Sequence, residues 1–271
     1  MIREQLMKAH PERDGDFRWR GDGVSRIEGL SDSVFGFAVT LLVVSLDVPD
    51  TFTDLAAMML GLPAFAATFT LLVLVWFAQY RFFRRYGMED TRTIVLNVAL
   101  LFVVLFYIYP LKFLFQTFIG LILGLVGWKL DIAWLGPLGQ ASRAAIRGDQ
   151  WPALMCVYAG GYAALYGLFA LMHAHALARR ADLGLDEVEA LITRYAVYEN
   201  LVFVLVAVLS LVVLVLLGVV MGVPIYATGF FAGWTYMLIW PFQAVLGRRL
   251  DREKRALRAR DAAAGPVVAP A

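Results

Sequence analysis

Two stretches of this chain, residues 55–80 and 201–221, run without a single charged side chain. As an α-helix, each is long enough to cross the ~30 Å hydrocarbon core of a bilayer, which requires about 20 predominantly apolar residues. Hydrophobic residues make up 61% of the sequence and charged residues 17%, whereas soluble domains have roughly half and a quarter. We therefore predict an all-α polytopic membrane protein with no large soluble domain.

Apolar segments separated by polar or turn-forming loops predict six transmembrane helices. Their uncharged cores lie at residues 33–46, 55–80, 93–111, 152–172, 201–221 and 225–246. Beyond Lys112 another apolar run reaches Trp128, and the sequence leaves open whether the third helix continues past the membrane or folds back as an outer hairpin. We expect residues 1–25 to form a cytoplasmic arm, residues 26–247 the six-span domain, and residues 248–271 a basic cytoplasmic tail with a disordered end.

The distribution of lysine and arginine predicts the orientation of the chain. Twenty of the 24 basic residues lie before the first span or in the segments 81–92, 179–194 and 248–260. The positive-inside rule assigns these segments to the cytoplasm, so both termini are expected there and the number of crossings is even. This placement also accounts for the net charge of +2, and we predict no nucleic-acid partner.

Residues that could perform chemistry are sparse. The chain has no Gly-x-Ser-x-Gly, no His-Glu-x-x-His and no phosphate-binding glycine loop ending in Lys-Ser/Thr. His173 and His175 are two residues apart, so a helix points them to different faces and they lack the i, i+4 geometry of a helical metal site. We therefore predict no enzymatic activity, no metal site and no bound cofactor.

The first apolar segment begins beside an ionisable residue. Residues 33–46, between Asp32 and Asp47, would rise only about 21 Å as a helix, which is shorter than the hydrocarbon core. One or both carboxylates should therefore lie at or inside the membrane boundary, where a charge is unfavourable unless it faces protein or water. The presence of an ionisable residue at this position is therefore a hint of function.

One face of the same helix is apolar. A period of 3.6 residues places Phe37, Leu41 and Val44 on this face, with Thr40 beside them. The simplest interpretation is packing against a neighbouring helix. The alternative is a pore, because helices that meet at a symmetry axis can present apolar rings, which gate by dewetting, and a hydroxyl ring that solvates an ion. The spacing alone leaves both interpretations open.

Around this helix the sequence resembles the transmembrane protein 175 family, the endosomal and lysosomal potassium channels and their bacterial relatives. The family pattern is Arg-x-x-x-Phe-Ser-Asp, followed by Thr-Leu, in the first of six spans. The matching residues are Arg26, Leu30, Ser31, Asp32, Thr40 and Leu41, and the likeness extends to Val48, Pro49, Trp76, Asn97 and Pro110. The chain departs from the pattern at Leu30, which replaces the phenylalanine, and at the bulkier Phe37. It also departs at Gln79 and Tyr80, where histidines are common.

The resemblance implies a homotetramer in the bacterial plasma membrane, with the first helix of each subunit lining a central pore. Phe37, Leu41 and Val44 match the positions of the family's apolar constriction. Thr40 matches the pore threonine implicated in potassium preference. The expected function is passive conduction of the potassium ion through this constriction.

The resemblance also implies a hydrogen-bond network at the cytoplasmic end of the first helix. Its members here would be Arg26, Ser31, Asp32, Trp76 and Asn97. In this network Asp32 would be paired, with Arg26 and Ser31 as its nearest candidate partners. The departures at Leu30, Phe37 and Gln79 suggest an alternative function. In that case the protein is a non-conducting membrane scaffold, or a transporter of the same fold with altered or lost ion selectivity.

Overall fold

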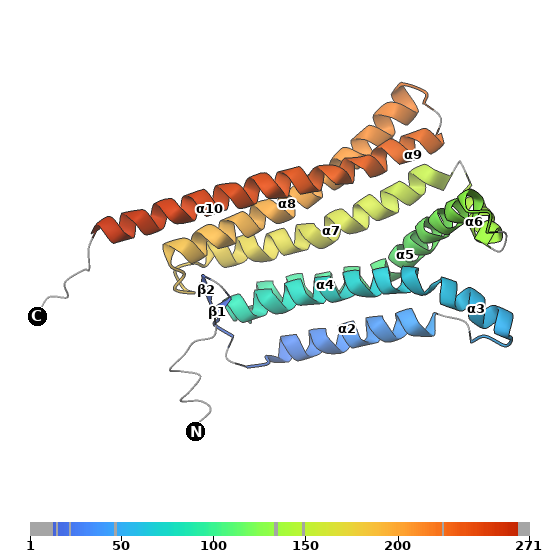
Figure 1. Cartoon of the computed structure of the whole chain (residues 1–271). Coiled ribbons are helices and arrows are strands. Elements are labelled where there is room, and N and C mark those ends of the chain that lie inside the picture. Colours follow the sequence, from blue (N-terminus) through green and yellow to red (C-terminus); the bar gives the residue numbers. More distant parts are fainter. Residues whose placement is uncertain are drawn as a thin grey trace, which may run out of the picture.

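The computed structural model describes residues 13–14, 16–21, 23–45, 48–132, 135–147, 150–223 and 225–264. Its helices run roughly lengthwise in one elongated bundle (Figure 1). The start of α2 (Arg26–Val44) and the end of α10 (Ile239–Ala264) lie at the same end of the bundle. This arrangement is what an even number of membrane crossings requires, and we refer to this end as the inner end.

Five helices in the described residues are long and apolar enough to cross a membrane. They are α2, α4 (Leu62–Tyr86), α5 (Thr91–Lys129), α7 (Trp151–Ala178) and α8 (Glu187–Val215), the last continued by a π-helical turn at Leu216–Val220. The predicted sixth span corresponds to α9 (Ile225–Trp234), a 3-10 turn (Thr235–Leu238) and the start of α10, which follow one another without a break. Because the 3-10 turn divides this segment and α10 continues into the charged tail, the sixth crossing stays a prediction.

The second apolar stretch is divided into two helices, which corrects the predicted single span over 55–80. The short helix α3 (Phe52–Leu60) ends before Gly61, and α4 begins at Leu62. Pro63 in the first turn of α4 has no N–H group, and a proline is favoured at the start of a helix. A new helix therefore begins beside this proline, whereas α5 accommodates Pro110 inside a continuous helix.

The helix α5 settles the alternative left open beyond the third span. It runs unbroken through Pro110 to Lys129, and its 39 residues rise about 58 Å, much more than a bilayer core. The short helix α6 (Gly136–Ala144) then folds back against the end of α5. Gly124 and Gly139 meet backbone to backbone there, so a side chain on either residue would overlap the other. The helix thus continues past Pro110, and the chain reverses only after Lys129.

α2 lies at one edge of the bundle (Figure 1) and packs against α4 and α5. A capping box starts the helix, since the Ser25 hydroxyl accepts from the Glu28 N–H (3.2 Å) and the Glu28 carboxylate accepts from the Ser25 N–H (2.8 Å). The side chains of Phe35, Ala38 and Leu42 are buried in the core shared with α4, α5 and α7. This buried face fixes how α2 sits on its neighbours.

A two-stranded antiparallel hairpin, β1 (Arg13–Asp14) and β2 (Phe17–Arg18), precedes α2. The buried ring of Phe17 meets the ring of Tyr86 edge to face, with centroids 5.3 Å apart. Asp16 in the hairpin turn is ion-paired with Arg258 of α10. The described part of the predicted N-terminal arm is therefore packed against the inner end of the bundle.

The predicted tail is helical as far as the structure describes it. α10 passes position 248 without interruption and continues to Ala264. Residues 265–271, which include most of the segment expected to be disordered, lie outside the described residues, as do residues 1–12 and Asp47. The boundaries of the predicted arm, six-span domain and tail stay predictions.

Candidate functional site

Three buried polar side chains connect α2, α5 and α4. The Asn97 amide donates to the Ser31 hydroxyl (2.9 Å), and the Gln79 amide donates to the Asn97 side-chain oxygen (2.6 Å). Ser31 in turn donates to the backbone carbonyl of Ile27 (2.8 Å). All three polar side chains are at most 2% exposed, and a buried polar group is favourable only when it is hydrogen-bonded. We call Ser31, Asn97 and Gln79 the amide chain.

Asp32, the next residue on α2, has a different partner. The indole N–H of Trp76 on α4 donates to Asp32 Oδ1 at 2.8 Å. Because a carboxylate is the acceptor, this is a charge-assisted hydrogen bond and stronger than one between neutral groups. Asp32 itself is exposed, so its second oxygen remains accessible at the inner end of α2.

Within one chain the structure brings the residues of the predicted network together in two separate pairs. Ser31 is joined to Asn97, and Asp32 is joined to Trp76. Among the described residues, no ion pair joins Arg26 to Asp32, so the single chain does not bring these two together, and the network as a whole stays a prediction. Arg26 is exposed in the first turn of α2, which leaves its guanidinium at the inner end of the exposed face.

Gln79 was not predicted as a member of the site. Its sequence signal is nonetheless simple, because an uncharged amide near the end of an apolar run must find a partner when the helix is buried. Gln79 is 2% exposed and lies within hydrogen-bond distance of Asn97. Its polar side chain extends the amide chain from two helices to three.

The face of α2 opposite to the amide chain is exposed. Phe37 is 67% exposed, Leu41 39% and Val44 71%. Thr40 is also exposed, and its hydroxyl donates to the Gly36 carbonyl of the preceding turn at 2.9 Å. This bond uses the hydroxyl proton inside the helix, so the oxygen lone pairs remain available to accept a hydrogen bond or to coordinate a cation. The four predicted pore residues thus share one accessible stripe.

A lysine that was not predicted fixes the outer end of α2. Lys112 on α5 donates to both the backbone carbonyl (2.6 Å) and the hydroxyl (2.7 Å) of Ser45, the C-terminal cap of α2. A cation at a helix C-terminus complements the negative end of the helix dipole. Lys112 is the only charged residue between Thr93 and Trp128, which is the signal that could have identified it.

Among the described residues, no group of three or more His, Cys, Asp or Glu side chains could hold a metal ion. What the structure presents is a helix with one anchored face, one accessible apolar face with a hydroxyl, and charges at the inner end. Helices that turn such faces toward a common axis can line ion pores and form hydrophobic gates.

Known proteins share this sequence and fold. The family model described as "Endosomal/lysosomal potassium channel TMEM175" matches residues 26–107, the segment that contains α2, α4 and the first part of α5. A protein of Marivirga tractuosa named "Potassium channel" is 35% identical over 242 residues, which are 89% of this chain and 94% of that protein.

The fold agrees with the sequence comparison. A crystal structure of a variant of the potassium channel MtTMEM175, in complex with a nanobody–MBP fusion protein, matches with a TM-score of 0.72 at 33% identity. The match covers 89% of this chain and 99% of that channel. With likeness over nearly the full length of both relatives, and with the residues of the family's motif gathered on α2 and its neighbours, this chain belongs to the TMEM175 family of potassium channels.

Proposed function

We propose that this protein is a potassium-permeable cation channel in which four copies of α2 surround a central pore. The observation that carries the proposal is the exposed stripe of Phe37, Leu41 and Val44, which is apolar but interrupted by the hydroxyl of Thr40. Membership of a potassium channel family supports the same conclusion. Conduction is passive, with the potassium ion as the permeant species, no resident cofactor and no catalytic step.

The composition of the stripe favours a pore over a purely lipid-facing surface. Ser33 and Thr40 are both exposed on α2, and Arg26 lies at its inner end. Both hydroxyls donate to carbonyls of their own helix, but their remaining lone pairs and the Arg26 guanidinium find no partner among lipid tails, whereas a water-filled axis hydrates them. A helix that turned this face to lipid would gain nothing from these groups.

The proposed mechanism is an apolar constriction with a polar ring inside it. A fourfold ring of Phe37 or Leu41 leaves a narrow apolar passage, which conducts when water fills it and closes when it dewets. The Thr40 ring would replace part of the hydration shell of an ion that has entered this passage, and Asp32 at the inner end would attract cations. Because Phe37 is the bulkiest of these residues, its ring would set the width of the apolar constriction.

Location and assembly belong to the same proposal. The basic residues at the inner end of the bundle support a multi-pass protein of the plasma membrane with both termini in the cytoplasm. A homotetramer supplies the symmetry axis that the exposed face of α2 requires, because a single helix cannot enclose a pore. The lipid bilayer and the other subunits are therefore the expected partners.

Potassium flux from liposomes tests the channel directly. Phe37→Ala removes the widest side chain of the stripe, so we expect the potassium conductance to rise at least threefold while the protein stays folded. Phe102→Ala on α5 is the matched control, because that phenylalanine is 69% exposed but lies outside the proposed pore. Flux should be the same in this control as in the unmodified protein.

Two results would overturn the proposal. Unmodified protein that is folded in liposomes but passes no potassium would favour the alternative of a non-conducting scaffold or a transporter. A mass measurement in lipid that finds only monomers would remove the symmetry axis, and with it the pore.

A further inference from the structure

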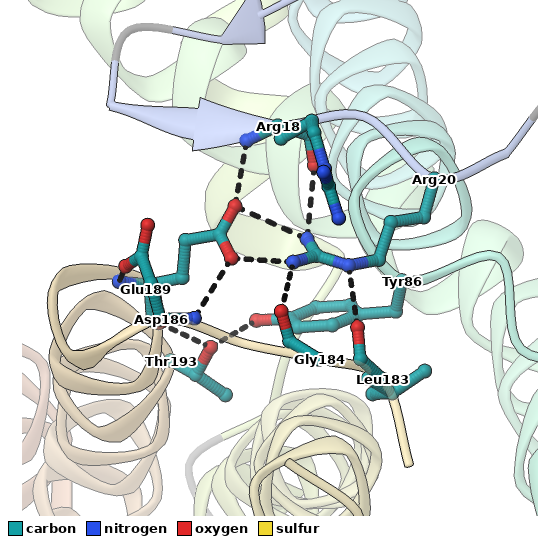
Figure 2. Close-up of polar contacts among 8 residues, drawn as sticks. All are labelled: Arg18, Arg20, Tyr86, Leu183, Gly184, Asp186, Glu189 and Thr193. Atoms are coloured by element: carbon teal, nitrogen blue, oxygen red, sulfur yellow. Dashed lines mark hydrogen bonds and ion pairs between the residues drawn. The ribbon is translucent and has the colours of Figure 1, made fainter. Parts of the chain in front are cut away.

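The chain segment just before α2 is bound to the turn between α7 and α8 by one arginine (Figure 2). The Arg20 guanidinium donates to the backbone carbonyls of Leu183 (2.8 Å), Gly184 (3.0 Å) and Arg18 (3.1 Å). The same guanidinium forms a two-point ion pair with the Glu189 carboxylate on α8. A planar fork that satisfies carbonyls and a carboxylate together is specific to arginine.

The Glu189 carboxylate is equally well satisfied. It accepts from the backbone N–H groups of Arg18 (2.9 Å) and Asp186 (3.2 Å), in addition to its bonds with Arg20. The side chains of Arg20 and Glu189 are only 11% and 4% exposed. A buried ion pair of this kind adds little net stability but specifies one geometry. We call Arg20, Glu189 and the two carbonyls of the α7–α8 turn the N-terminal clasp.

Further hydrogen bonds to α4 support the N-terminal clasp. Below it, the Tyr86 hydroxyl of α4 donates to the Thr193 hydroxyl of α8 at 2.9 Å, so these two helices are joined directly (Figure 2). The backbone N–H groups of Arg20 and Gly21 both donate to the carbonyl of Arg84 on α4 (2.9 and 3.2 Å). The segment that carries Arg20 is therefore fixed to two helices at once.

The segment leads into α2 after only a few residues. Ser25 caps α2, and the Arg84 guanidinium of α4 donates to the carbonyls of Gly21 and Gly23 (3.2 Å each) on the way. α2 itself packs on α4 and α5, so the N-terminal clasp is what connects its start to the α7–α8 turn. These contacts therefore limit how far the start of α2 can shift relative to α8.

We propose that Arg20 and Glu189 are positioning residues that hold the inner end of α2 away from the fourfold axis. This inference rests on the proposed channel function. Because the stripe faces a water-filled axis in the proposed channel, its apolar side chains leave water when the four copies approach one another, which draws the helices together and narrows the pore. The N-terminal clasp pulls in the opposite direction, because it ties the start of each α2 to the outer helices of its own subunit.

A double-mutant cycle with potassium flux tests this role. Glu189→Gln keeps a side-chain oxygen for the capping box of α8 but removes the charge, and Arg20→Gln removes the other partner. We expect each single variant to lower flux per tetramer at least fivefold. Flux in the double variant should be no lower than in the single variant with the lower flux, because both changes remove the same contact. Asp182→Asn, which removes the exposed Arg179–Asp182 pair, should leave flux unchanged.

Cross-linking provides a readout that a merely structural role would not change. Cys156 is the only cysteine, so Cys156→Ser with Leu30→Cys gives one thiol at the inner end of the exposed face of α2. Glu189→Gln should accelerate disulfide formation between subunits, because the four inner ends approach the axis.

A failure of the proposed clasp and a failure of the proposed channel function would give different results. Unchanged flux and cross-linking in both single variants would overturn the clasp, as would a loss of flux that only follows a loss of folded tetramer. If the unmodified protein passes no potassium, the channel function fails, yet the cross-linking rates still decide whether the clasp positions α2.

Discussion

Phe35 and Phe37 lie two residues apart on α2, yet Phe35 is 4% exposed and Phe37 is 67% exposed. On the Phe35 side the helix packs against α4 and α5, and its Ser31 hydroxyl is bonded to the buried amide of Asn97. On the Phe37 side the apolar side chains are accessible and the Thr40 hydroxyl is bonded only within its own helix. The first face therefore fixes where the helix sits.

The second face is free to take another role. In a membrane, apolar side chains gain little by leaving lipid for protein, so helices associate through close packing and hydrogen bonds. The buried face of α2 has both. Its side chains are packed against neighbouring helices, and the amide chain hydrogen-bonds α2 to α5 and extends to α4. The accessible face can change its neighbours, which is what a gate at a symmetry axis needs. Substitutions on the two faces should therefore affect different properties.

Phe35→Ala against Phe37→Ala is the most direct comparison of the two faces. Removing the buried ring should lower the free energy of unfolding by about 3 kcal/mol, near the low end for a buried phenylalanine, because lipid rather than water surrounds the loosened helix. Removing the exposed ring should change it by less than about 0.5 kcal/mol. Denaturant unfolding of both variants in the same detergent checks the difference, and equal losses would contradict it.

Asn97→Ala tests the amide chain in the centre of the buried face. The change leaves the Gln79 amide, which is 2% exposed, without its acceptor, and an unsatisfied buried group costs about 1–3 kcal/mol. We expect a loss of about 2 kcal/mol in unfolding experiments. Asn200→Ala is the control, because its half-buried amide bonds only to the Ala196 carbonyl of its own helix (2.7 Å). A loss in this control as large as that of Asn97→Ala would exclude a special role for the amide chain.

The buried face could be predicted in part from the sequence. Ser31 and Asn97 are polar residues at the edge of or inside apolar runs, so their burial and pairing follow from the cost of an unsatisfied group in a membrane. The placement of Phe37, Leu41 and Val44 on one stripe follows from helical periodicity. Whether such a stripe packs, faces lipid or lines a pore depends on neighbours that periodicity does not contain.

The remaining partners depend on how the helices cross. Asp32 was expected beside Arg26, but the crossing of α2 and α4 places Trp76 at hydrogen-bond distance. Lys112 reaches Ser45 across 67 positions of sequence, and the N-terminal clasp joins residues that are more distant still. Such pairs are fixed by the angle and register of whole helices, which local sequence does not encode. The division of the second span lies at Gly61 and Pro63, but such residues alone do not predict a break, because α5 runs through Pro110.

Trp76→Phe tests the hydrogen bond to the charged side chain of Asp32 separately from the packing contacts of α2. The change keeps an aromatic ring but removes the N–H group that donates to Asp32 at 2.8 Å. Because Asp32 is exposed, water replaces much of the lost bond, and we expect a loss of about 1 kcal/mol. A thermal melt in detergent measures it. Leu74→Met, a change at an exposed position of the same helix, should leave the melt unaltered, and a matching loss there would contradict the assignment.

The smallest effect is expected at the start of α5, the helix that carries Asn97 to the buried face. Asp90 precedes this helix and accepts hydrogen bonds from the Thr93 hydroxyl (2.6 Å) and His175 Nε2 (2.8 Å). Burial raises the pKa of Asp90, but these hydrogen bonds and the charges of His175 and Arg179 outweigh it and hold the pKa below its ordinary value.

The sign of the pH dependence follows from this depressed pKa. The unfolded chain binds a proton on Asp90 near pH 4, whereas the folded protein keeps the carboxylate charged to lower pH. The stabilisation is therefore present above about pH 4 and is lost as the pH falls through the folded value. Asp90→Asn should flatten this part of the acid unfolding curve, measured by circular dichroism, while Asp182→Asn should not. If the curve of Asp90→Asn coincides with that of the unmodified protein below pH 4, Asp90 does not anchor α5, and the buried face of α2 depends on its amide chain and packing alone.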